Sequence, residues 1–208
     1  PPGDYRISAP LIVGLPNLII MGAGASALGL STSGTVITQA TSNSDIFTTG
    51  TIVTGPGPAY SLAIRDLNLT YAGGLGSATG GAAIRLAYTQ VAWIERVYIA
   101  TCYDGIVFGA DTASPPTNPV VCLWVWVKDC VIAGVVDAAF TISGKNEILN
   151  ISDNLCFGYG GNPGSSIVLK MTALSYCDVM YFNRNDCEGF GNGVLLINTS
   201  AVAGLSGY

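Results

Sequence analysis

The chain has no histidine, and only 10% of its 208 residues are charged. The absence of histidine excludes a serine nucleophile that is activated by a histidine base. Any catalysis by this chain would therefore use carboxylates, Tyr, Lys or Arg. A soluble globular domain usually carries about 25% charged residues, so we expect partner subunits to cover much of the surface.

Cysteine is present, but its spacing does not indicate metal binding. The six residues contain no CxxC pair, and no histidine is there to complete a zinc site. We therefore expect no metal, no cofactor, and reduced, buried thiols. The six residues are Cys102, Cys122, Cys130, Cys156, Cys177 and Cys187.

Basic charge and long apolar runs are also missing. The net charge of −5 argues against nucleic acid as a partner, because a protein that binds the phosphate backbone needs a basic face. The longest apolar runs, such as Val120 to Val127, are far shorter than the roughly 20 residues that span a bilayer, so no membrane span is expected. The chain opens at Pro1 without an initiator Met, and we expect it to be part of a longer protein.

What the chain does contain is glycine, at 27 positions, and short runs rich in Val, Ile and Thr. Because Gly and Pro interrupt any helical period, the sequence predicts an all-β protein. Five segments share one pattern: an apolar residue, two polar residues, then inward-facing candidates at the fourth and sixth places. A second short apolar strand follows each of them. The five segments begin at Ile64, Ile94, Val127, Ile151 and Phe182.

The repeat has a period within the range of about 20 to 50 residues that is typical of solenoids, propellers and arrays. Each unit reads as strand, two-residue polar corner, strand, loop and strand, which describes a coil and not a blade of hairpins. We therefore predict a right-handed parallel β-helix of about six to eight coils, stacked about 4.8 Å apart. It forms a single domain over 1–208, with N-terminal coils at 1–60, regular coils at 61–198 and an exit segment at 199–208.

Alternation along the strands assigns inward rows, in which each residue stacks on its equivalent in the next coil. One row, just after the corner, changes from Leu67, Val97 and Cys130 to Asn154 and Asn185. Stacked Asn side chains bond to each other and to turn backbone, so burial there is tolerable. The other rows are Leu62, Ala92, Val125, Leu149 and Met180; Ile64, Ile94, Val127, Ile151 and Phe182; and Leu69, Ile99, Ile132, Cys156 and Cys187.

The first residues carry a resemblance to a known superfamily. Pro1–Ile7, followed by Leu18–Gly24, resembles the entry to the β-helices of the pectate-lyase superfamily. That superfamily includes bacteriophage tailspikes and extracellular polysaccharide-degrading enzymes. The resemblance implies a β-helical fold and a place on a virion surface or outside the cell.

The corners supply the candidate catalytic residues. Asp129 and Asp153 occupy the second corner position of neighbouring units, so they are expected one rung apart, near the roughly 5 Å between the carboxyls of retaining glycosidases. Like charges at that distance raise one pKa, which would give an acid beside a base. Glu95 is the third catalytic candidate. The alternative is that these corners are solvated and joined by exposed ion pairs.

The outward position just before each corner is rich in aromatic residues. It carries Trp93, Trp126, Asn150 and Tyr181 in successive units, and Trp124 lies two residues before Trp126 on the same face. Such a face offers indole surface to the C–H faces of a sugar, with Asn150 as a polar contact. The same face would equally suit a neighbouring subunit, because aromatic residues are enriched at interfaces.

Two further faces are predicted to be apolar, and together they favour a homotrimer packed about a common axis. One carries Tyr98, Ala100, Val131, Ala133, Leu155 and Phe157, and the other Val107, Val168 and Leu195.

The preferred hypothesis is a structural and receptor-binding component of a virion, resembling a phage tailspike or tail fibre. Its trimeric β-helical shaft would assemble with other virion proteins and contact host surface polysaccharide. The alternative is an extracellular polysaccharide lyase or glycoside hydrolase that uses the surface carboxylates, so enzymatic activity stays an open question. An adhesin or ice-binding solenoid is a third hypothesis, but ice binding would need a flat Thr or Ser array that is not seen.

Overall fold

The computed structural model describes residues 2–25, 34–49, 61–109, 122–158, 166–172 and 175–196, and every regular element in these ranges is a β-strand. The prediction of an all-β protein is confirmed. No helix in this part of the chain has the length and apolar character to cross a membrane. The strands are β1 (Gly3–Ile7), β2 (Leu11–Val13), β3 (Leu18–Met21), β4 (Thr35–Gln39), β5 (Phe47–Thr49), β6 (Leu62–Tyr71), β7 (Ala82–Leu86), β8 (Thr89–Ala100), β9 (Asp104–Phe108), β10 (Cys122–Lys128), β11 (Val131–Val135), β12 (Ala138–Ile142), β13 (Lys145–Ser152), β14 (Leu155–Gly158), β15 (Ile167–Met171), β16 (Tyr176–Asn183), β17 (Asp186–Glu188) and β18 (Asn192–Leu196).

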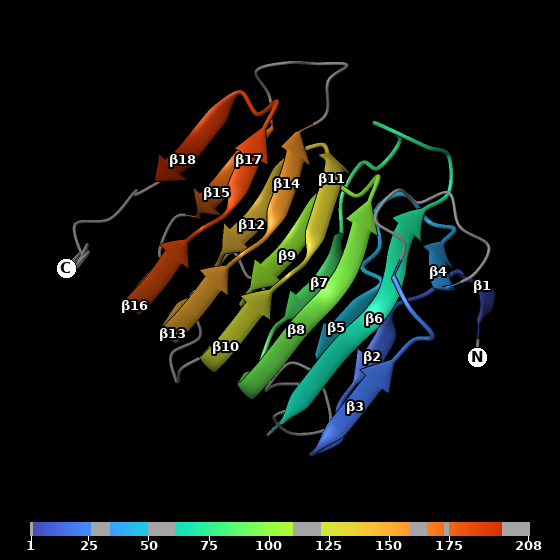
Figure 1. Ribbon diagram of the computed structural model, residues 1–208, viewed down its shortest axis with the longest axis horizontal. Coiled ribbons are helices and arrows are strands. Elements are labelled where there is room, and N and C mark those ends of the chain that lie inside the picture. The colour runs from blue at the N-terminus through green and yellow to red at the C-terminus, as the bar shows by residue number, and fades with distance from the viewer. Residues whose placement is uncertain are drawn as a thin grey trace.

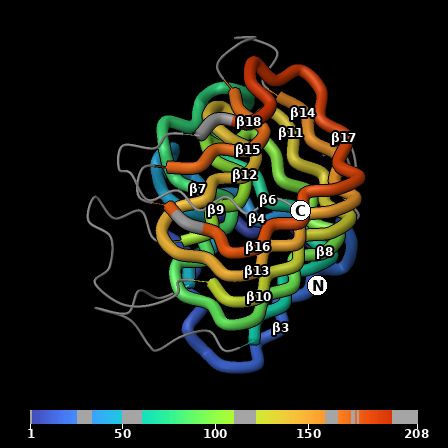
Figure 2. Tube along the Cα trace, turned by 90° about the vertical axis from the view of Figure 1, so that its left-hand side faces the viewer, coloured from blue at the N-terminus to red at the C-terminus, as the bar shows by residue number. Residues whose placement is uncertain are grey.

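The strands form two hydrogen-bonded sheets in which each strand lies beside its equivalent in the next unit (Figure 1). The 11-stranded sheet runs β1-β4-β6-β8-β10-β13-β16, with β3, β11, β14 and β17 attached beside this path. The seven-stranded sheet runs β18-β15-β12-β9-β7-β5-β2. All the strand pairings described are parallel; the pairing of β8 with β10 is one example. Figure 2 looks along the long axis and shows the turns of chain overlying one another around a common interior. This arrangement is consistent with a β-helix-like solenoid.

The corners are the sharpest local feature of each unit. The second corner residue has a left-handed backbone in all five units, with φ between 51° at Arg184 and 59° at Asp153. This conformation turns the chain from one face of the stack to the next, and it costs a non-glycine residue about 1–2 kcal/mol. Asp tolerates it better than Arg does. Both corner arginines are supported from the neighbouring rung, because Arg96 binds Asp66 and Arg184 binds Asp153 through two nitrogens each.

The register confirms three of the predicted inward rows in full. In the row just after the corner it pairs Leu67 with Val97, and hydrogen bonds join Cys130, Asn154 and Asn185. Leu62 pairs with Ala92, and the same row continues through Val125 and Leu149 to Met180. These side chains are buried except for Met180, which is half-buried near the C-terminal end. The seven-stranded sheet closes the core with larger side chains; Phe108 and Phe140 are the largest that are fully buried. Burial of apolar surface, at about 25 cal/mol per Å², is thus spread along the stack.

The row of Asn side chains is held by a chain of hydrogen bonds. Asn154 Nδ2 donates to the carbonyl of Val127 at 3.1 Å and to Asn185 Oδ1 at 2.9 Å. The Cys130 amide donates to Asn154 Oδ1 at 3.0 Å, and Asn185 Nδ2 donates to the carbonyl of Ile151 at 2.9 Å. The predicted bonding of stacked Asn side chains to each other and to turn backbone is confirmed. Burial of these amides is acceptable because both ends of each are paired.

Replacing Asn154 by Ala should destabilise the protein by about 1 to 3 kcal/mol, because it leaves the buried Cys130 amide without its acceptor and removes the amide donor to the Val127 carbonyl. Urea unfolding followed by circular dichroism measures the change. Asn183→Ala, at an exposed position on the next rung, is the matched control and should change stability little. Equal losses in the two variants would contradict the role given to this row.

Candidate functional site

The outward side chains of β8, β10, β13 and β16 form three rows, which together we call the tryptophan face. The middle row is the predicted one, because Trp93 pairs with Trp126, Trp126 with Asn150, and Asn150 with Tyr181. It is continued on β6 by Ala63. The row on one side is Val91, Trp124, Ile148 and Val179, and the row next to the corner is Glu95, Lys128, Ser152 and Asn183. The tryptophan face therefore changes from apolar at the Val91 row to polar at the Glu95 row.

Trp93, which is exposed, and Trp126, which is half-buried, form a nearly parallel ring pair on the outer surface. Their centroids are 5.3 Å apart and their planes differ by 9°. Aromatic planes in contact lie about 3.5 Å apart, so this centroid distance implies a sideways offset of roughly 4 Å. Each indole therefore overlaps only part of its neighbour and leaves part of its own surface to solvent. Trp93 and Trp124 are 44% and 49% exposed, and Tyr181 is 54% exposed.

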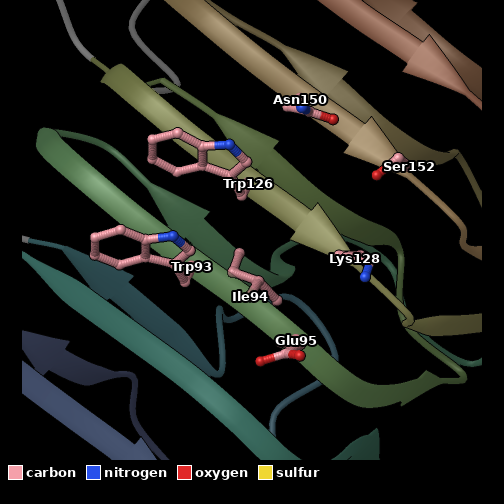
Figure 3. A pocket seen from close by; sticks show the side chains of 7 residues that line it. All are labelled: Trp93, Ile94, Glu95, Trp126, Lys128, Asn150 and Ser152. Atoms are coloured by element: carbon pink, nitrogen blue, oxygen red, sulfur yellow. The ribbon is translucent and has the colours of Figure 1, made fainter.

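An open hollow of about 270 Å³ lies beside the two indoles. Figure 3 shows the rings on one side of it, with Asn150, Ser152, Lys128 and Glu95 on the other and Ile94 between them. One wall is thus aromatic and the opposite wall carries amide, hydroxyl, ammonium and carboxylate groups. The sequence reasoning identified the aromatic wall and Asn150. It missed Lys128 and Ser152 because both belong to the corner pattern.

The polar wall is only partly engaged within the chain. Asn150 Oδ1 is buried and has no hydrogen-bond partner in the described structure, which leaves an acceptor beside Trp126. Glu95 accepts a hydrogen bond from Arg96, and Lys128 Nζ lies 3.4 Å from Asp129 Oδ2. The Lys128 and Asp129 side chains are 53% and 44% exposed, so their ion pair contributes little energy and is easily exchanged for a ligand.

The corner carboxylates lie in the predicted order, on neighbouring rungs. Lys128 pairs with Ser152, which places Asp129 and Asp153 at equivalent positions of adjacent units. Asp153 accepts hydrogen bonds from Arg184, and this partner lowers the pKa of the Asp153 carboxyl. A shared acid–base pair would have one raised pKa, and Asp153 is shifted the other way. The role of Asp129, Asp153 and Glu95 as catalytic residues stays a prediction.

The third outer face differs from the expectation. Val107 and Val168, predicted to be part of an exposed apolar surface, are only 1% and 6% exposed, while the Leu195 side chain lies outside the described ones. Val107 pairs with Arg85 on one side and Thr141 on the other. Arg85 and Thr141 are part of a polar network that the sequence reasoning missed, because its members are spread over five successive units and share no motif.

This network places Asp104 in an environment that disfavours its charge. Arg85 binds Asp45 and Lys170 binds Asp137, with all four side chains at least three-quarters buried. Asp104 accepts a hydrogen bond from Thr141 Oγ1 at 2.9 Å. Burial, and then the nearby charge of Asp137, raise the pKa of Asp104 to about 6. Among the described residues, no group of three or more His, Cys, Asp or Glu side chains is arranged to hold a metal ion.

Asp104→Asn should stabilise the protein at pH 7.5 by about 2 kcal/mol. At this pH the Asp104 carboxyl of the wild type is charged, and its raised pKa means that this charge is less stable in the folded protein than in the unfolded chain. Asn removes that cost. The gain should shrink as the pH falls through 6 toward 4, where the folded wild type is already protonated. Thermal unfolding at several pH values tests this. Asp153→Asn is the control, and it should destabilise the protein at neutral pH, because the lowered pKa of Asp153 means that its charge stabilises the folded state. An effect of Asp104→Asn that does not change with pH would contradict the raised pKa of Asp104.

Comparison with known proteins places the chain in no family. No protein-family model, no curated protein and no solved structure matches it.

Proposed function

We propose that the chain is a right-handed parallel β-helix of about six to eight coils, and that it is a structural and receptor-binding component of a virion, as in phage tailspikes and tail fibres. In this proposal the tryptophan face contacts a polysaccharide of the host surface. The observation that carries it is the hollow between the offset indoles of Trp93 and Trp126 and the polar wall opposite them.

The chemistry of that hollow matches a sugar better than a purely apolar or purely charged ligand. The C–H face of a pyranose packs on partly exposed indole, and its hydroxyls need donors and acceptors at the ring edge. Among the described residues, Asn150 Oδ1 has no hydrogen-bond partner; Lys128 is exposed at the rim of the hollow, and Glu95 is half-buried there. Rotation of the Asn150 amide would present this buried oxygen to a ligand hydroxyl and so pair an atom that is otherwise buried at a cost.

The trimeric part of the proposal uses a different face, the outward side of the β8, β11 and β14 segments after the corner. Tyr98, Val131, Leu155 and Phe157 are half-buried there, and they pair across successive strands without an intervening charge. We propose that neighbouring copies cover this face and leave the tryptophan face to the ligand.

The location is proposed to be the virion surface or outside the cell, with other virion proteins as partners. This part of the proposal rests on the resemblance of the first 24 residues alone.

A polysaccharide lyase or glycoside hydrolase is the alternative, and the described geometry favours it less. Asp153 is held by Arg184, and its pKa is lowered. Asp104 does have a raised pKa, but it lies on the seven-stranded sheet, away from the tryptophan face, and it is engaged by Thr141.

Trp126→Ala should reduce binding to polysaccharide by at least about tenfold, because it removes the shared stacking surface of the pair. The probe is a panel of purified bacterial O-antigen and capsular polysaccharides, with calorimetry on any that bind. Tyr5→Ala, an exposed aromatic of the first coil, is the control and should bind as wild type. Unchanged binding in Trp126→Ala, or no binding by the wild type to any member, would count against the glycan proposal.

Light scattering should give a solution mass of three times the 21.4 kDa of one chain. Val131→Glu should dissociate the trimer, because it places an unpaired charge in the proposed contact. Val179→Glu, on the tryptophan face, should leave the trimer intact. The reverse result would assign the tryptophan face to the subunit contact, and a monomeric wild type would remove the trimer from the proposal.

A further inference from the structure

Two of the six thiols occupy adjacent rungs of one inward row. Cys156 on β14 pairs in register with Cys187 on β17. Equivalent residues of neighbouring parallel strands lie about 4.8 Å apart, and disulfides form between Cα atoms roughly 4.4 to 6.8 Å apart. All six cysteines are free thiols in the structure. Five are buried, as predicted, but Cys187 is only half-buried, which differs from the prediction.

The two thiols also differ in chemistry. Their mutual interaction lowers the pKa of Cys187 and, together with burial, raises that of Cys156. Cys187 is also the more accessible of the two. Because thiolate is the attacking form in disulfide exchange, Cys187 is placed to react first and Cys156 to act second.

We propose that Cys156 and Cys187 are a disulfide-forming pair that joins β14 to β17 when the protein meets a small-molecule disulfide such as oxidised glutathione. The Cys187 thiolate attacks the oxidant, forms a mixed disulfide and releases one glutathione thiolate, which takes up a proton. Cys156 then loses its proton and displaces the second glutathione, so two protein thiols are oxidised and one oxidant disulfide is reduced. The proposal does not depend on glycan binding.

The other thiols lack this geometry. Cys122 and Cys177 share a row, but Asn146 lies between them, so they are two rungs apart. That separation, roughly 9 to 10 Å, exceeds the reach of a disulfide. Cys102 and Cys130 are fully buried. Cys122 and Cys177 therefore form a natural control within the same chain.

The bond would close the segment that contains β15 and β16, including Tyr181 of the tryptophan face. A cross-link restricts the unfolded chain more than the folded one, so the oxidised protein should unfold at a temperature several degrees higher. A reducing medium would release this constraint and leave the folded pairing of β14 with β17 unchanged.

The test is to incubate the folded full chain with oxidised glutathione and to analyse it by intact mass and by peptide mapping without reduction. We expect the loss of two hydrogen masses, a cross-linked pair of peptides holding Cys156 and Cys187, and four remaining titratable thiols after unfolding. In Cys156→Ser the glutathione adduct at Cys187 should persist, because the resolving thiol is gone. Cys177→Ser should still form the cross-link.

Two results would overturn the proposal. One is a wild type that keeps six thiols, which means that Cys187 does not attack the oxidant, or that retains glutathione on Cys187, which means that Cys156 does not resolve the mixed disulfide. The other is a cross-link that maps to a different pair. Circular dichroism of each variant before oxidation checks that loss of the bond is not loss of the fold, and Cys187→Ser, at the less buried position, provides a second variant if Cys156→Ser does not fold.

Discussion

Parallel, in-register pairing of equivalent strands is the constraint on which the rest of this structure depends. It places every residue about one rung from its equivalent in the next coil, so each side chain packs chiefly against residues of the same position. Apolar side chains stack on apolar ones in the interior, as in the row from Leu62 to Met180. Asp and Arg meet at the corners, and Trp93 meets Trp126 on the outside.

The same constraint explains how polar groups enter the core. A single buried amide would leave donors and acceptors unpaired, but Asn154 stacks on Asn185, and both bind the backbone of the preceding turn. The left-handed corners follow a similar rule, because the arginines at two of them are held by the Asp of the neighbouring rung. A change at one rung therefore alters the environment of the rungs on either side.

The few charged side chains of the protein are distributed unequally over its outer surfaces. The tryptophan face combines exposed rings with a polar wall. The outward face of β8, β11 and β14 after the corner is half-buried and uncharged as far as β17, where Asp186 and Glu188 continue it. The seven-stranded sheet carries the network of Asp45, Arg85, Asp137 and Lys170. The three surfaces therefore differ in what they can bind. We connect the first with a glycan and the second with neighbouring copies, while the third places a carboxyl, Asp104, where its charge is costly.

The strands, the corners and the inward rows can be predicted from the sequence, because a two-residue alternation repeated in five units specifies which positions must stack. It also placed Trp93, Trp126, Asn150 and Tyr181 in one outward row. The contacts of those residues could not be predicted from the sequence. The offset of the two rings, the ion pair of Asp153 with Arg184 and the burial of Val107 depend on side-chain conformation and on neighbours in the adjacent unit. The same holds for Asn150 Oδ1, which has no hydrogen-bond partner among the described residues. Alternation states on which side of a strand a residue lies, but the atoms that it touches are set by the packing of neighbouring coils.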